Sequence, residues 1–307
     1  WRQQGSIVND TPVEALPPGV TDAGRIDEYR GWKDRPLSYR MIRADSPRFS
    51  LLYLHGIESH NTWFLPAAQR LARQGCTTYL LDRRGSGLNR EPDPGDAPSA
   101  AALIEDVMCF RQQHADAPMH LAALSWGGKL ALATALQHPH AWQSLTLITP
   151  GLCPAVDLSL WHKAAAALNL IVGGRATFPT PICPEMFTTT PAYLDFIRHD
   201  PWRLKRVTAR FLRTTFTLDR RFTRRGARLT IPVLLLLAER DVIIDNAKVE
   251  ALVRSVQPEA NVIMFDNADH AVIFDRVNDV ADHILNHVRS AASPKRSEAP
   301  VAAASAA

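Results

Sequence analysis

The stretch Ala123-Leu124-Ser125-Trp126-Gly127-Gly128-Lys129 joins an apolar segment, residues 119–124, to a segment with helical spacing, residues 126–138. Alanine and glycine stand two residues before and two residues after the serine. A larger side chain at either place would collide with neighbouring backbone in a sharp strand-to-helix turn. Such a turn holds the serine hydroxyl above the end of the strand and at a helix N-terminus. We interpret Ser125 as a nucleophile held in this turn; the alternative is a serine that only caps the helix.

Outward from this turn, segments typical of strands alternate with segments typical of helices. The predicted strands are residues 25–32, 37–43, 49–55, 76–82, 119–124, 144–149, 232–238 and 261–265. The predicted helices between them are residues 61–74, 99–114, 126–138, 246–256 and 276–288. This alternation predicts an α/β fold with a mostly parallel eight-stranded sheet flanked by helices, because parallel neighbours need helical crossovers.

The alternation stops between residues 151 and 228, where no strong strand pattern is found. Residues 158–172, 191–199 and 201–225 are predicted to be helices instead. We interpret this helical block, inserted after the sixth strand, as a cap over the carboxyl edge of the sheet, where open α/β sheets bind ligands. The predicted organisation is an N-terminal arm (1–24), a core (25–150 and 229–290), the cap (151–228) and a disordered tail (291–307).

The chain has 307 residues, 46% of them hydrophobic, which is enough for one large core and a covering unit. Its longest purely apolar run, residues 233–238, is far shorter than the roughly 20 residues that cross a bilayer. We predict no signal peptide and a cytoplasmic location, although the start at Trp1 leaves processing or export open. The four cysteines form no C-x-x-C pair and are expected to be free thiols. A Cys153–Cys183 disulfide is the alternative in an exported protein.

Positive charge is concentrated in the predicted cap. Residues 198–228 hold eleven basic residues and two acidic ones, although the net charge of the whole chain is only +4. A basic cap suggests peripheral contact with an anionic membrane surface or with acidic substrates, and the alternative is a solvated cationic face. No nucleic-acid-binding module is found, and the oligomeric state stays open.

A serine hydroxyl needs a base to act as a nucleophile at neutral pH. Asp241 follows the predicted strand 232–238 by three residues, and His270 lies in the loop after the predicted strand 261–265. Both therefore emerge at the sheet edge where Ser125 stands, in the chain order serine, acid, histidine that such sites use in this kind of fold. The other nearby acids are interpreted as a helix cap or as supports of the histidine loop: Asp245, Asp266 and Asp269.

Acyl transfer also needs hydrogen-bond donors for the developing oxyanion. The backbone amide of Trp126, the residue after the nucleophile, is one candidate. The second is the amide of Ile57, which follows Gly56 in the loop after the third predicted strand. His55 is interpreted as a structural histidine that anchors this loop.

The stretch His55-Gly56-Ile57-Glu58-Ser59-His60-Asn61-Thr62-Trp63-Phe64 resembles the oxyanion-loop signature of one branch of the α/β-hydrolases. This is the monoacylglycerol lipase and lysophospholipase branch, also called the serine aminopeptidase-like hydrolases. His60 and Phe64 match its pattern, whereas Glu58 and Trp63 replace a usual glycine and arginine. Asp82-Arg83-Arg84-Gly85-Ser86-Gly87 is similar to the D-x-R-G-x-G turn of the branch, and residues 186–212 and 234–245 are similar to its cap and its acid region.

The resemblance covers about residues 25–290 and implies an α/β-hydrolase fold without a cofactor or metal. It also implies activity on lipid-like or small esters, such as monoacylglycerols or lysophospholipids. Glu58, His60, Trp63 and Phe187 are candidate substrate contacts. The leading hypothesis is a serine hydrolase that cleaves carboxylic esters. The alternatives are a peptidase, lactonase, carbon–carbon hydrolase or acyltransferase with the same residues, and a binding module without catalysis.

The predicted cap carries large apolar residues that are expected to line either a substrate pocket or the cap's own core. They are Leu160, Trp161, Leu168, Ile171, Phe187, Phe196, Phe211 and Phe216. The sequence does not divide them between these two places, so the acyl-chain length and the stereochemistry of the substrate stay open.

Overall fold

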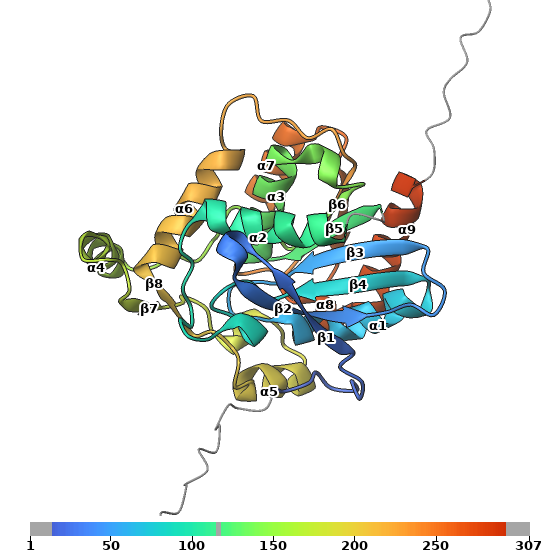
Figure 1. The fold of residues 1–307 in the computed structure, drawn as a ribbon, viewed down its shortest axis with the longest axis horizontal. Coiled ribbons are helices and arrows are strands. Elements are labelled where there is room, and N and C mark those ends of the chain that lie inside the picture. The colour runs from blue at the N-terminus through green and yellow to red at the C-terminus, as the bar shows by residue number, and fades with distance from the viewer. Residues whose placement is uncertain (1–13, 115–117, 293–307) are drawn as a thin grey trace, which may run out of the picture.

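A computed structural model, which describes residues 14–114 and 118–292, has an eight-stranded sheet at its centre (Figure 1). The strands are β1 (Arg25–Arg30), β2 (Pro36–Ile42), β3 (Phe49–Leu54), β4 (Cys76–Leu81), β5 (Met119–Leu124), β6 (Leu145–Ile148), β9 (Val233–Ala238) and β10 (Asn261–Phe265). Their order is β1-β2-β4-β3-β5-β6-β9-β10. The pairs β1–β2 and β2–β4 are antiparallel and the others are parallel, which confirms the predicted sheet.

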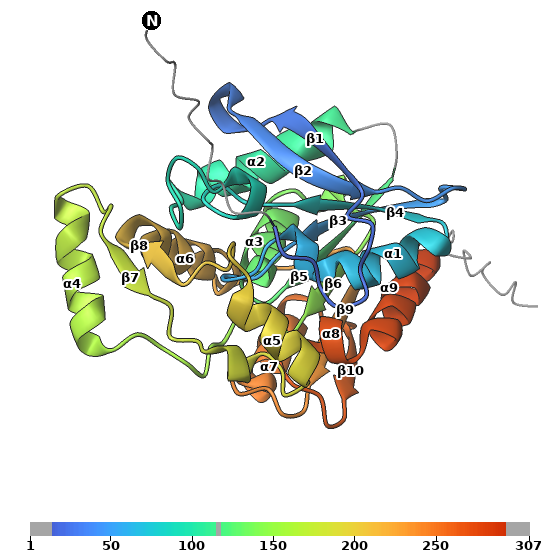
Figure 2. The ribbon, with the colours of Figure 1, turned by 90° about the horizontal axis from the view of Figure 1, so that it is seen from below.

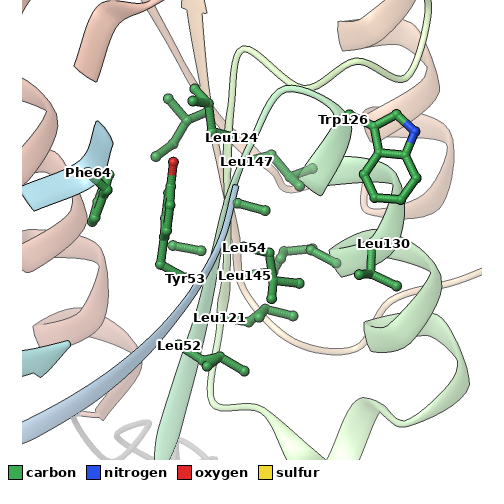
Figure 3. Close-up of a cluster of buried hydrophobic side chains, with 14 of the residues drawn as sticks. Leu52, Tyr53, Leu54, Phe64, Leu121, Leu124, Trp126, Leu130, Leu145 and Leu147 are labelled. Carbon is green, nitrogen blue, oxygen red and sulfur yellow. The ribbon is translucent and has the colours of Figure 1, made fainter. Parts of the chain in front are cut away.

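The middle of the sheet is apolar because both of its faces are covered. Every residue of β5, β6 and β9 is buried, as expected for parallel strands with helices on both sides. Figure 3 shows Phe64 on one side of Tyr53 and Leu130 on the far side of the strands. The rings of Tyr53 and Phe64 stack with their centroids 3.9 Å apart.

Helices form the two outer layers. On one side α1 (Leu65–Arg73) packs against α8 (Val272–Asp275) and α9 (Val277–Ala292). On the other side α2 (Ala100–Gln113) packs against α3 (Trp126–Gln137), and α7 (Asn246–Val256) connects β9 to β10. This arrangement brings the carboxyl ends of the parallel strands to one edge of the sheet.

The chain between β6 and β9 forms the predicted inserted segment, residues 151–228, which we call the cap (Figure 2). Its elements are α4 (Leu160–Ile171), β7 (Thr177–Pro179), α5 (Pro191–His199), β8 (Arg206–Thr208) and α6 (Ala209–Phe222). The expectation that the cap contains no strand is wrong, because β7 and β8 pair in an antiparallel way. The predicted helix 201–225 is also too long: α6 begins at Ala209, since the Thr208 hydroxyl caps it by accepting a hydrogen bond from the Phe211 amide.

The large apolar residues of the cap are distributed differently from the prediction. Phe187, Phe196 and Phe211 are buried, as expected. Phe216 of α6 is 62% exposed but lines a cavity beside the cap, which the prediction also allowed. In contrast, Leu160, Trp161, Leu168 and Ile171 of α4 are between 69% and 82% exposed. Figure 2 explains the exposure of α4, which stands at the outer side of the cap, away from the sheet. Only Ala166 of this helix is buried.

The remaining predictions concern the chain ends and the cysteines. All four cysteines are free, as predicted. Residues 14–24 of the predicted arm contain no helix or strand, and residues 1–13 and 293–307 lie outside the described residues. Within residues 14–114 and 118–292, no helix has both the length and the apolar character needed to span a membrane.

Candidate active site

Ser125 stands at the turn between β5 and α3 with a backbone φ of 50° and ψ of −122°. A non-glycine residue in this left-handed region costs about 1–3 kcal/mol and is held there by its surroundings. A Cβ added at Gly127 would lie 2.4 Å from the Leu54 carbonyl oxygen, and one at Gly128 would lie 2.6 Å from Pro150 Cβ. The small residues are therefore required by close packing. The Ser125 side chain makes no capping hydrogen bond to α3, so the interpretation as a simple helix cap is wrong.

Asp241 and His270 meet at the carboxyl ends of β9 and β10. His270 Nδ1 lies 2.7 Å from Asp241 Oδ2, and both side chains are almost fully buried. The other carboxylate oxygen, Oδ1, accepts hydrogen bonds from the backbone amides of Ile243 and Ile244. Because the carboxylate is an acceptor, the imidazole proton belongs on Nδ1, which leaves a lone pair on Nε2.

The loop of His270 is attached to the same sheet edge as Ser125. The Ser125 amide donates to the Ile148 carbonyl at 2.9 Å, and the hydroxyl of the next residue, Thr149, donates to the His270 carbonyl at 2.9 Å. His270 Nε2 is buried and has no hydrogen-bond partner among the described residues. A hydroxyl, an imidazole nitrogen that can accept a proton and a buried carboxylate are the groups that nucleophilic acyl transfer requires.

Two of the neighbouring acids, Asp245 and Asp269, have structural roles, in agreement with the prediction. The Asp245 side chain accepts a hydrogen bond from a backbone amide in the first turn of α7 and so caps that helix. Asp269 accepts hydrogen bonds from the amide and the hydroxyl of Thr189, which ties the histidine loop to the cap. Asp266 is exposed. When Asp241 is compared with Asp245, Asp266 and Asp269, it is the Asp241 carboxylate that is hydrogen-bonded to His270.

The loop after β3 passes directly beside the serine, since a Cβ added at Gly56 would lie 3.3 Å from Ser125 Cβ. Ile57 and Trp126 line the same cavity as Ser125. In the part of the chain that the structure describes, neither the Ile57 amide nor the Trp126 amide donates a hydrogen bond to another group. Two free amides next to a serine hydroxyl are what an oxyanion hole needs.

Two buried side chains hold this loop from behind. His55 Nδ1 lies 2.8 Å from the Gly56 carbonyl oxygen, and His55 Nε2 accepts a hydrogen bond from the Arg83 amide. Burial, and then the charge of Arg83, lower the pKa of His55 well below its usual value, so the ring is neutral. His55 therefore anchors the loop as predicted. The sequence interpretation did not single out Arg83, whose guanidinium also donates to this loop.

A cavity of about 710 Å³ opens beside Ser125, between the sheet edge and the cap. Its walls are mainly apolar and include Ala166 and Leu170 from the inner side of α4. The lining also contains charged side chains, and four of them neutralise one another in the ion pairs Lys129–Asp219 and Lys163–Asp157. A cavity with these walls suits an apolar chain whose reactive end lies at the serine.

The four candidate substrate contacts lie outside this lining, as far as the described residues show. Glu58 is buried and pairs with Arg203 of the cap, with 2.6 Å between Oε2 and Nε. Burial raises the pKa of Glu58, and the guanidinium of Arg203 opposes that rise. Glu58 therefore joins the loop after β3 to the cap.

His60, Trp63 and Phe187 also make internal contacts. His60 Nε2 and Trp63 Nε1 lie 2.9 and 2.8 Å from the same carboxylate oxygen of Asp200. Burial alone would raise the pKa of Asp200, but these hydrogen bonds outweigh burial and lower it. The Phe187 ring lies 6.0 Å from that of His270 and 5.5 Å from that of Trp63, measured between centroids. We therefore propose no substrate contact for these residues.

With this mostly parallel sheet flanked by helices, the protein is an α/β-hydrolase of the monoacylglycerol lipase-like branch, as its sequence relatives and structural neighbours show. A family model described as "Serine aminopeptidase, S33" matches residues 45–277, which is more than half of the chain. The protein belongs to this family.

Individual relatives agree with this assignment. The chain is 23% identical over 293 residues to a monoglyceride lipase of Mus musculus, and the match covers 92% of this chain and 91% of that one. A solved structure of a soluble variant of monoglyceride lipase from Saccharomyces cerevisiae, in complex with a substrate analog, has the same fold, with a TM-score of 0.78 at 17% identity. It covers 91% of this chain and 100% of that chain. A shorter match, 31% identical over 139 residues, spans 44% of this chain and 44% of an sn-1-specific diacylglycerol lipase of Mus musculus.

Proposed function

We propose that this protein is a serine hydrolase that cleaves carboxylic esters through an acyl-enzyme. The observation that carries the proposal is the His270–Asp241 hydrogen bond of 2.7 Å at the sheet edge where Ser125 is held in a strained turn. Strained backbone persists only where the surrounding structure holds it, and such residues cluster at active sites.

In the proposed reaction Ser125 Oγ attacks the acyl carbon while His270 Nε2 takes the hydroxyl proton. The negative charge on the acyl oxygen is bound by the amides of Ile57 and Trp126. His270 then gives its proton to the leaving alcohol as the ester C–O bond breaks. A water molecule attacks the acyl-enzyme in the same way, and a carboxylic acid leaves. Asp241 holds the imidazole and stabilises its cation.

The substrate class that we propose is an ester with an apolar acyl chain of the lipid type. Two observations support it: the mainly apolar cavity of about 710 Å³ beside Ser125, and the lipases among the relatives of the chain. Four of the five charged side chains in the lining form ion pairs, and the fifth, Arg213, is exposed, so the lining does not require a charged acyl chain.

A panel of p-nitrophenyl esters with acyl chains from two to eighteen carbons, together with monoacylglycerols and a matched amide, tests this proposal. Each added methylene that enters the cavity contributes about 0.8 kcal/mol, so kcat/KM is expected to rise by a few-fold per carbon until the cavity is filled. Mass detection of the products distinguishes hydrolysis from transfer to an added alcohol. Faster cleavage of the amide than of the ester would favour a peptidase, and kcat/KM that is independent of chain length would contradict the substrate class.

We also propose that the cap contacts an anionic lipid surface. The outer side of α4 exposes Leu160, Trp161 and Ile171, while its inner side contributes Ala166 and Leu170 to the cavity. An exposed apolar helix face of this kind is typical of segments that lie in a membrane interface. Eight of the eleven basic residues in 198–228 form no ion pair with a carboxylate among the described residues, and these eight supply the complementary charge for anionic headgroups.

Flotation with phosphatidylserine-containing vesicles measures this contact. The double variant Trp161→Ser, Ile171→Ser is expected to bind at least about tenfold more weakly, because each large apolar side chain contributes about 1.5–3 kcal/mol when fully buried. The matched control is Ile26→Ser, which changes an exposed residue of β1 far from the cap. Binding that is equal in the double variant, or that does not depend on anionic lipid and salt, would contradict the proposal.

A further inference from the structure

The guanidinium of Arg83 lies directly behind the loop that carries Ile57. Its NH1 donates to the Gly56 carbonyl oxygen at 2.7 Å, and its NH2 donates to the carbonyl oxygen of Ile57. The Gly56 carbonyl and the Ile57 amide belong to one planar peptide group and point in opposite directions. A side chain that fixes the Gly56 carbonyl therefore also fixes the direction of the Ile57 N–H.

The same side chain contacts the residue that offers the second free amide. The Arg83 guanidinium carbon lies 5.0 Å from the centre of the Trp126 ring and 5.1 Å from that of Phe211, which is within the range of cation–π contacts. The two rings stack on each other with their centroids 4.8 Å apart. Arg83 thus touches both Ile57 and Trp126, although the two residues come from different loops.

Arg83 differs from its neighbour Arg84 in how its charge is held. Arg84 is paired with the carboxylate of Asp106 through two nitrogens. Arg83 is 9% exposed and forms no ion pair with a carboxylate within residues 14–114 and 118–292. Burial lowers the pKa of Arg83 to about 9, against the opposing effect of Asp82, so the group remains charged at neutral pH. Burying a cation against backbone carbonyls is costly and indicates a role other than stability.

A buried cation at the oxygen end of a peptide group also polarises that group. Hydrogen bonds in series strengthen one another at low dielectric, so a carbonyl that accepts from a guanidinium has a more strongly donating N–H at its other end. Preorganised donors of this kind act where negative charge develops in the transition state.

We propose that Arg83 is a positioning residue that orients and polarises the Ile57 amide for the oxyanion. The inference rests on the proposed function of Ser125. It assigns a role in the reaction to a residue that does not touch the substrate.

The variants Arg83→Met and Arg83→Lys test this role with p-nitrophenyl butyrate as substrate. Arg83→Met removes both donors and the charge. In this variant kcat is expected to fall by about ten- to a hundredfold, which is somewhat less than the effect of losing a whole oxyanion donor. KM is expected to change by less than about threefold. Arg83→Lys keeps the charge and one donor and is expected to recover part of the loss. The affinity for an alkyl trifluoromethyl ketone, which forms the tetrahedral oxyanion, should fall in parallel with kcat/KM. The affinity for the matching alkyl methyl ether, which forms none, should not change.

Arg111→Met is the matched control. Arg111 is partly buried and also donates to two backbone carbonyls, those of Ala141 and His114, but it lies on α2 away from the site. The Arg111→Met variant is expected to have a lower midpoint of thermal unfolding and an unchanged kcat. If Arg83→Met does not fold, Arg83→Lys carries the test, because its kcat/KM and its trifluoromethyl ketone affinity must still fall together.

An unchanged kcat in Arg83→Met would overturn the inference, and so would an unchanged kcat in Arg83→Lys if Arg83→Met does not fold. Equal losses of affinity for the ketone and the ether would also overturn it. The same loss of kcat in Arg111→Met as in Arg83→Met would be the third contradicting result. Failure of the proposed function gives a different result. If Ser125→Ala keeps the activity, the hydrolase site itself is misassigned. If Ser125→Ala loses activity while the Arg83 variants keep it, only the role of Arg83 is wrong.

Discussion

Ser125→Ala is expected to lower kcat for ester hydrolysis by at least about 10⁴-fold, because the variant has no hydroxyl from which an acyl-enzyme can form. The residual rate would come from direct attack of water on the bound ester, with the free amides of Ile57 and Trp126 as the remaining source of catalysis. The measurement is the initial rate with p-nitrophenyl butyrate. Intact-mass analysis after treatment with a fluorophosphonate should show one adduct on the wild type and none on the variant.

Ser99→Ala is the control for this result. The Ser99 side chain caps α2 by accepting a hydrogen bond from the Ala102 amide, so its loss is expected to cost about 1 kcal/mol of stability and leave kcat unchanged. A Ser125→Ala variant that retained more than about a hundredth of the wild-type rate, or that still took up the label, would show that another residue is the nucleophile.

Asp241→Asn is expected to lower kcat by about 10⁴-fold without unfolding the protein. Asp241 Oδ1 accepts from the amides of Ile243 and Ile244, so the carbonyl oxygen of asparagine will take this position. The asparagine NH₂ group then faces His270 Nδ1 and forces the ring proton onto Nε2. A ring with its proton on Nε2 cannot accept the proton of Ser125.

The matched control is Asp245→Asn, four residues further along the same loop. The Asp245 side chain caps α7, and the hydrogen bond and charge of Lys248 lower its pKa, so the loss of its charge should change stability slightly and kcat less than about twofold. Steady-state kinetics and thermal unfolding of both variants give the comparison. A larger loss of kcat in Asp245→Asn than in Asp241→Asn would reverse the assignment of the acid.

The sequence predicts the sheet and the pairing of Asp241 with His270 because both depend on local signals. Apolar runs such as β9 identify buried strands, and the carboxyl ends of parallel strands meet at one edge whatever the details of packing. Residues that follow such strands are therefore brought together by topology alone. The requirement for glycine at position 127 comes instead from the neighbouring strand β3, whose Leu54 carbonyl oxygen would lie 2.4 Å from an added Cβ.

The contacts around the loop after β3 could not be predicted in this way. Glu58 pairs with Arg203, which is 145 residues away, and a charged residue in a loop gives no signal that it is buried. Arg83 stands in a turn with a recognisable pattern, but its contact with Gly56 depends on how two loops pack in space. The exposure of α4 was missed for a related reason: an apolar pattern does not say which partner covers it.

The weak attachment of α4 has a consequence for how substrates enter. Ala166 is the one buried residue of this helix, so lifting α4 separates one small apolar cluster, Ala166 with Phe178 and Ala209, from which the main core is distinct. The loops that carry Ile57 and His270 contact other parts of the cap, through Glu58 with Arg203 and Asp269 with Thr189, and these contacts need not break. Entry and chemistry are thereby separated: the cavity can widen for a long chain while Ile57 and His270 keep their positions.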